Sequence, residues 1–255
     1  MAQTFDLMPL WAFLAALGIS GLGGFVKGAV GFAMPLVIVS GLSLFLEPTL
    51  AIAGLIVPTV VLNMVQAFRY GLPNVRAVIR EYRRYLALVC AMILITAQFV
   101  TRIPAETYYL IVGIPIVFLS VIQLLGVRPR IPDNRRAVAD WSIGLTAGAL
   151  GGFSGTWGPP TVLYLMAIGT PKAKSMLVQG AVYGVGSIFL LAGHVQSGVV
   201  NWVTLPFTTA LLFPALIGQA IGLRMSDRLD PERFRRLTLI VIAIAGLNLI
   251  RRAVF

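Results

Sequence analysis

Two glycine-rich stretches interrupt the apolar sequence, and they contain the residues best suited to bind an anion. The first, from Gly21 to Pro35, reads GLGGFVKGAVGFAMP, and the second, from Gly148 to Pro160, reads GALGGFSGTWGPP. Glycine lets the backbone leave a helix and approach a ligand closely. Where a helix restarts after such a break, its first N–H groups and the positive end of its dipole point into the break. Two helix starts that meet in this way would bind a negatively charged solute.

Lys27 is the charged residue of the first break. Apart from Asp6, it is the only charged side chain among the first 46 residues. A charge at membrane depth is costly and usually functional, which makes Lys27 a candidate anion ligand. The alternative is that its side chain extends to the lipid–water interface.

The other candidate substrate-binding residues lie in the two breaks and on the spans that follow them. Ser154 and Thr156 offer hydroxyl donors, and Trp157 is either part of the site or an aromatic anchor at the membrane interface. Asn63 and Gln179, on the following spans, either face the site or join neighbouring helices. Four glycines complete the set: Gly28, Gly31, Gly155 and Gly158.

The composition predicts that these residues are held by membrane helices. Hydrophobic residues form 58% of the 255-residue chain and charged residues 11%, whereas a soluble domain carries about a quarter charged residues. A spanning helix needs about 20 mainly apolar residues, and such stretches follow one another along the chain. We therefore expect an all-α polytopic membrane protein embedded in a lipid bilayer, and a soluble enzyme is disfavoured.

Two series of apolar runs are visible, and each opens with a short pair separated by a glycine-rich break. Such a pair is typical of a broken helix or a tight hairpin, which gives about eight to ten membrane segments. The runs lie near 9–25, 28–46, 49–68, 85–101 and 108–126, then near 138–153, 156–169, 175–195, 203–223 and 235–253.

The two series predict an internal repeat. At a spacing of 127 residues, Gly21, Gly24, Gly28 and Gly31 align with Gly148, Gly151, Gly155 and Gly158. We expect two repeats of inverted topology, 1–127 and 128–255, in a single membrane domain, each with a broken helix or hairpin and three spans. Inverted repeats around a central site are a plan of secondary transporters. Close helix packing is the alternative use of Gly24 with Gly28 and of Gly151 with Gly155.

The basic residues indicate the orientation of the chain. The net charge is +11, and the cations concentrate in loops 69–84, 127–140, 170–174 and 224–236. These short loops fit the positive-inside pattern of membrane proteins better than a nucleic-acid surface. All four fall on one side if each opening pair of runs returns to its starting side. We expect that side to be cytoplasmic and both termini to lie outside.

Catalytic and metal chemistry finds little support in the sequence. No Asp, His and Cys constellation at catalytic or metal-ligand spacing lies at membrane depth, Cys90 is the single cysteine, and a Walker A motif is missing. We therefore expect neither an enzyme nor a cofactor. A secondary transporter is favoured, and an anion channel with the same repeats is the alternative. Counterflow separates the two, because only a transporter shows substrate-accelerated exchange.

In its two glycine-rich breaks, their continuations Met34-Pro35 and Gly158-Pro159-Pro160, and its tandem halves, the chain resembles the TauE/SafE family of membrane permeases. The resemblance covers essentially the whole chain. It implies a permease of the bacterial inner membrane that exports small anions, among them sulfur oxyanions and organosulfonates such as sulfite or sulfoacetate. The partner is then a small anionic solute, and self-association into a homo-oligomer is left open.

Overall fold

Helices account for the regular structure of the part of the chain that the computed structural model describes, residues 7–127, 129–226 and 230–254, and no strand occurs there. The expected all-α membrane fold is confirmed, since six of these helices are long and apolar enough to cross a membrane. The helices are α2 (Leu10–Val30), α3 (Met34–Leu42), α4 (Pro48–Phe68), α5 (Leu72–Glu81), α6 (Arg83–Ala97), α7 (Ala105–Leu124), the short 3-10 helix η1 (Asp133–Arg135), α8 (Arg136–Ser154), α9 (Gly158–Ala167), α10 (Lys172–Gln196), α11 (Leu205–Met225) and α12 (Pro231–Val254).

Both expected breaks exist, but they are shorter than predicted. Helix α2 continues to Val30 and ends at Gly31, whose φ of 85° is a left-handed conformation that glycine adopts without strain. Helix α8 ends in the same way at Gly155, with a φ of 69°. Lys27 therefore lies in the last turn of a helix rather than in a loop. By conformation Gly31 corresponds to Gly155, whereas the predicted repeat aligns Gly31 with Gly158.

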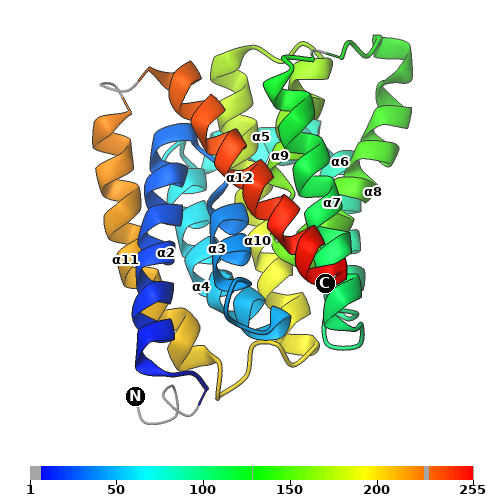
Figure 1. Ribbon diagram of the computed structural model, residues 1–255. Helices are drawn as coiled ribbons and strands as arrows, with labels where there is room; N and C mark the ends of the chain where they lie inside the picture. The colour runs from blue at the N-terminus through cyan, green and yellow to red at the C-terminus, as the bar shows by residue number, and fades with distance from the viewer. Residues whose placement is uncertain (1–6, 128, 227–229, 255) are drawn as a thin grey trace.

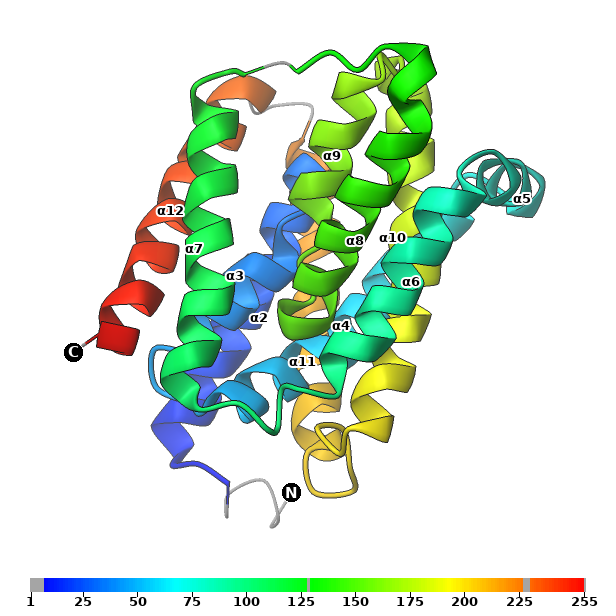
Figure 2. The same ribbon diagram turned by 90° about the vertical axis from the view of Figure 1, so that its right-hand side faces the viewer.

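The pairs α2–α3 and α8–α9 each return the chain to the end of the bundle from which it came (Figure 1). One end of the bundle, the upper end in Figures 1 and 2, contains the segments with the basic loops. These are helix α5, the α7–α8 and α9–α10 connections, the end of α11 and the start of α12. The described parts of the four basic loops therefore share one end, as expected. Arg128 and Arg228 of these loops lie outside the described residues. The inverted repeat and its boundaries stay a prediction.

Glycines bring α2 into backbone contact with α11. A Cβ atom on Gly24 would overlap the carbonyl oxygen of Ala215, and one on Gly28 would overlap that of Gln219. From the other helix, a Cβ on Gly218 would overlap the carbonyl oxygen of Gly21. Small residues usually serve in membrane helices to let two backbones come this close. Inside lipid no hydrophobic driving force holds helices together, so helix–helix association depends on close packing. The packing interpretation of Gly24 and Gly28 is thus correct.

Helices α6 and α8 pack in the same manner. Positions 148 and 152 of α8 are glycines, and a Cβ there would collide with Val89 and Thr96 of α6. Thr96 also donates a hydrogen bond of 3.1 Å to the carbonyl oxygen of Ala149. Two tightly joined pairs, α2–α11 and α6–α8, therefore flank the broken helices.

Thr208 of α11 forms hydrogen bonds with the backbone of α4 next to an internal proline. Pro58 has no N–H for the carbonyl oxygen of Gly54, and its ring disturbs the preceding turn. The Thr208 hydroxyl donates to that carbonyl at 3.3 Å and accepts from the N–H of Val57 at 3.1 Å. In lipid every backbone polar group needs a protein partner, and this contact supplies one for the Gly54 carbonyl oxygen that Pro58 leaves without an N–H.

The orientation can be tested with single cysteines. In a Cys90→Ser background, we expect Ser197→Cys to react with an impermeant thiol reagent on intact cells. Arg76→Cys and Arg130→Cys, which lie at the basic end and are exposed, should react only after the cells are opened. Labelling of Arg76→Cys and Arg130→Cys but not of Ser197→Cys on intact cells would reverse the orientation.

Candidate functional site

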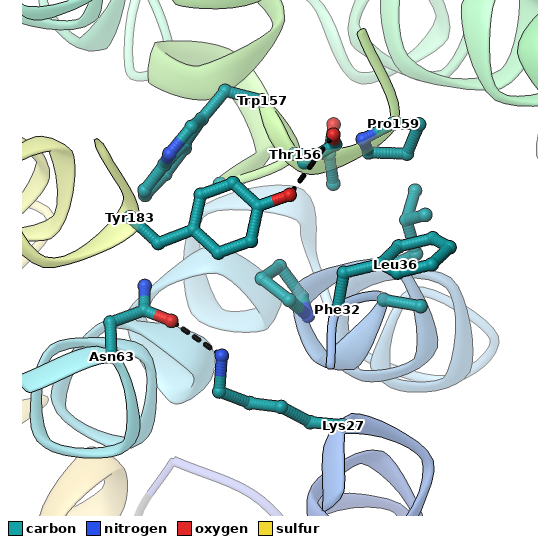
Figure 3. Close-up of a pocket in the computed structure, with 12 residues that line it drawn as sticks. Lys27, Phe32, Leu36, Asn63, Thr156, Trp157, Pro159 and Tyr183 are labelled. Atoms are coloured by element: carbon teal, nitrogen blue, oxygen red, sulfur yellow. Dashed lines mark hydrogen bonds between the residues drawn. The ribbon is translucent and has the colours of Figure 1, made fainter. Parts of the chain in front are cut away.

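The two breaks meet at a cavity inside the bundle. Phe32 and Pro35 of the first break, Thr156 and Gly158 of the second, and Tyr183 of α10 contribute to its walls (Figure 3). A Cβ atom added to Gly158 would lie 3.7 Å from the Cβ of Phe32, so the two breaks come within one methyl group of each other. The cavity volume is about 20 Å³, which is room for about one water molecule. An anion can therefore bind here only if the walls move apart.

Lys27 points from α2 into this cavity and is buried, with 3% of its surface exposed. Its ammonium donates to Asn63 Oδ1 at 2.6 Å and to Gln66 Oε1 at 2.9 Å, and it lies 5.7 Å from the centre of the Tyr183 ring. The alternative that Lys27 reaches the lipid–water interface is therefore wrong. Buried charges normally have a partner of opposite sign, but no carboxylate among the described residues lies within ion-pair distance of Lys27.

The chemistry of the two amides explains how the charge is tolerated. Amide oxygens accept hydrogen bonds from an ammonium group and so replace part of its hydration. They carry no net charge, however, and leave the positive potential of Lys27 in place. An acidic partner would have cancelled that potential. The cavity therefore contains a desolvated, uncompensated cation, an arrangement that attracts an anion.

Two half-helices begin at the cavity, α3 at Met34 and α9 at Gly158. Their dipoles add positive potential at the same place. Prolines at the second position of both helices lack N–H groups, and in α9 Pro160 follows as well. The N–H of Thr161 is already bonded to the carbonyl oxygen of Trp157 at 3.2 Å. Gly158 therefore has the one N–H group in the first turn of α9 that could face a ligand. The prolines thus reduce the number of unsatisfied N–H donors at the cavity. The charge of Lys27 therefore contributes a larger share of any attraction to an anion.

The second break is ordered by hydrogen bonds. Ser154 donates to the carbonyl oxygen of Leu150 at 2.8 Å, and its Oγ lies 2.5 Å from that of Thr156. Tyr183 donates from its hydroxyl to the carbonyl oxygen of Gly158 at 3.2 Å, which ties α10 to the start of α9. Trp157 is 2% exposed and stands at an 80° angle to the Tyr183 ring. Its alternative role as an interfacial anchor is wrong.

The predicted site residues fall into two groups. Those that line the cavity are Lys27, Asn63, Gly155, Thr156, Trp157 and Gly158. The others stand behind the walls: Gly28 packs on α11, Gly31 ends α2, Ser154 orients Thr156, and Gln179 bonds Ser175 and Tyr183.

Besides apolar wall residues, two polar residues at the cavity were not among the predicted site residues. Tyr183 follows Gln179 by four positions, and Gln66 follows Asn63 by three. Residues at these spacings share a helix face, so each lies on the face already assigned to the site. The helical spacing of three or four residues from Asn63 and Gln179 could therefore have identified Gln66 and Tyr183 from the sequence.

A chain of hydroxyl groups leads from the cavity toward the basic end. Thr161 donates to the carbonyl oxygen of Trp157 at 2.6 Å, and Tyr85 lies 2.9 Å from the Thr161 hydroxyl. Since the Thr161 proton is already used, Tyr85 must donate. Tyr85 stacks on Tyr164 at 4.5 Å between ring centres, and Tyr164 donates to Asp140 at 2.5 Å. Asp140 lines a basic depression at the surface.

Comparison with known proteins agrees with this architecture. Residues 16–249 match the family model described as "Sulfite exporter TauE/SafE". No curated protein and no solved structure matches the chain. Because the match covers nearly the whole chain, including both breaks, the chain belongs to the sulfite exporter TauE/SafE family and is a multi-pass membrane transporter rather than an enzyme.

Proposed function

We propose that this transporter carries small anions by secondary transport and exports sulfur oxyanions or organosulfonates such as sulfite or sulfoacetate. The observation that supports this best is the buried ammonium of Lys27, held only by neutral amides at the point where two helix starts meet. Sulfite and sulfonate groups are compact, negatively charged and rich in acceptor oxygens. Such a group complements an ammonium and a few N–H groups.

The arrangement of the helices supports alternating access. The glycine contacts make α2–α11 and α6–α8 close-packed pairs, whereas the two breaks touch through a thin layer of side chains around the cavity. Tilting one bundle against the other would open this layer first to one side and then to the other. The proposed inverted repeats would make these two movements equivalent.

The basic end of the bundle supports a bacterial inner-membrane location with that end in the cytoplasm. An inside-negative potential would then favour export of an anion by about 2.3 kcal/mol per charge per 100 mV. Export thus needs no ATP-binding domain on this chain.

Transport can be tested in proteoliposomes that contain the purified protein. We expect uptake of labelled sulfite or an organosulfonate to be accelerated by the same unlabelled anion on the other side, because a carrier returns faster when loaded. An anion channel would conduct without this acceleration. Absence of flux for sulfite, sulfoacetate and ethanesulfonate in liposomes with verified, folded protein would contradict the proposed substrate class.

A further inference from the structure

A second compartment adjoins the cavity on the side away from Lys27. It shares Leu36, Thr156 and Pro159 with the first compartment as wall residues. Its remaining walls come mainly from α7, through Ser120 and Gln123, and from Leu239 of α12. The two compartments therefore meet at the same pair of helix starts.

Among the polar wall residues of this second compartment, Gln123 carries an acceptor without a partner. Its side chain is 5% exposed, and Nε2 donates to the carbonyl oxygen of Leu119 at 3.3 Å. The other atom, Oε1, is buried without a hydrogen-bond partner. Such an acceptor is rare in folded proteins, because leaving it unpaired in an apolar surrounding is costly. An acceptor that faces a cavity can be satisfied by a donor on a bound molecule.

We propose that the two compartments together bind one substrate, an organic sulfonate whose short tail carries a hydroxyl group. This inference rests on the proposed anion transport and narrows its substrate. The sulfonate lies at Lys27 and the helix starts, the methylene groups pass between Leu36 and Pro159, and the hydroxyl donates to Gln123 Oε1. Bare sulfite would reach the walls of the first compartment only.

The walls favour a hydroxyl over an ammonium group at the end of the tail. Leu36, Leu239 and the other apolar side chains of the second compartment offer no counter-charge, and its lining includes no carboxylate. Burying an unpaired ammonium there would be far more costly than burying a hydroxyl with one acceptor. The compartment thus selects for a neutral donor.

The test compares ethanesulfonate with 2-hydroxyethanesulfonate, which differ by one hydroxyl. We expect wild-type protein in proteoliposomes to prefer the hydroxylated compound by roughly ten- to a hundredfold in apparent affinity, the usual effect of pairing a buried acceptor. Gln123→Leu should remove this preference by weakening 2-hydroxyethanesulfonate alone. Gln123→Met keeps a similar side-chain length and serves as the second variant if the leucine protein does not fold.

Gln219→Leu is the matched control, since Gln219 is also a buried glutamine of a membrane helix but lies on α11 outside both compartments. It should keep the wild-type preference. Equal affinity of wild-type protein for the two sulfonates, or an equal loss of both in the Gln123 variants, would overturn the inference. The proposed anion transport would then still stand if ethanesulfonate or sulfite is carried and depends on Lys27.

Discussion

Replacing Lys27 with methionine is expected to lower the apparent affinity for a small anion by roughly ten- to a hundredfold, the range for losing a buried hydrogen bond to a charged group. The physical reason is the absence of any other buried cation at the cavity in the described residues. Methionine keeps a similar length and fills the same space between α2 and α4. Transport of one confirmed substrate in proteoliposomes measures the effect.

Lys27→Arg should retain more activity than Lys27→Met, because it keeps the charge while changing its shape and hydration. Lys174→Met is the control. Lys174 is a lysine at the basic end whose side chain is 44% exposed and bridges Glu81 at 2.7 Å, and exposed pairs contribute little to stability. Equal rates and equal apparent affinities in Lys27→Met and wild-type protein would exclude Lys27 from the site.

The same substitution should not weaken the fold. Lys27 is a desolvated charge without an acidic partner among the described residues. Its removal relieves a desolvation penalty, which offsets the cost of leaving the Asn63 and Gln66 amide oxygens without their donor. We therefore expect the melting temperature of Lys27→Met in detergent to be equal to or above that of wild-type protein. A lower melting temperature would mean that Lys27 serves mainly to hold α2 to α4.

Gly24→Ala is expected to destabilise the protein strongly, since the new methyl group would overlap the Ala215 carbonyl oxygen in a contact between two backbones. Overpacking typically lowers the free energy of unfolding by about 1–3 kcal/mol. We expect a loss at the upper end of this range, because the neighbour is backbone, which cannot move aside as a flexible side chain can. At that size the melting temperature should fall by roughly 10 °C. Thermal unfolding in detergent, followed by size-exclusion chromatography, gives the measurement.

Gly18→Ala provides the control on the same helix, because a Cβ atom there meets nothing within 4 Å. Alanine is also the better helix former, so Gly18→Ala should be neutral or stabilising. Melting temperatures that fall equally in the two variants would point to a general intolerance of α2 rather than to its contact with α11.

Composition and periodicity were sufficient to identify the membrane fold and the two breaks. Spanning helices require long apolar runs because the bilayer has a set thickness, and helices must end where glycine takes a left-handed conformation, as at Gly31 and Gly155. Lys27 could be singled out for a similar reason, since a charge in an apolar run has few uses other than function. These features depend on local sequence and on the solvent, and they do not depend on which helices are neighbours.

The partners of these residues depended on the tertiary structure. Asn63 and Gln66 meet Lys27 across more than 30 positions of sequence, and Gln123 faces its compartment from a helix that the sequence did not connect with the site. Polar residues in membrane helices either join helices or bind solutes, and the sequence pattern is the same for both. Only the packing of α4, α7 and α10 around the two breaks decided which side chains face the cavity and left Lys27 without an acidic partner among the described residues.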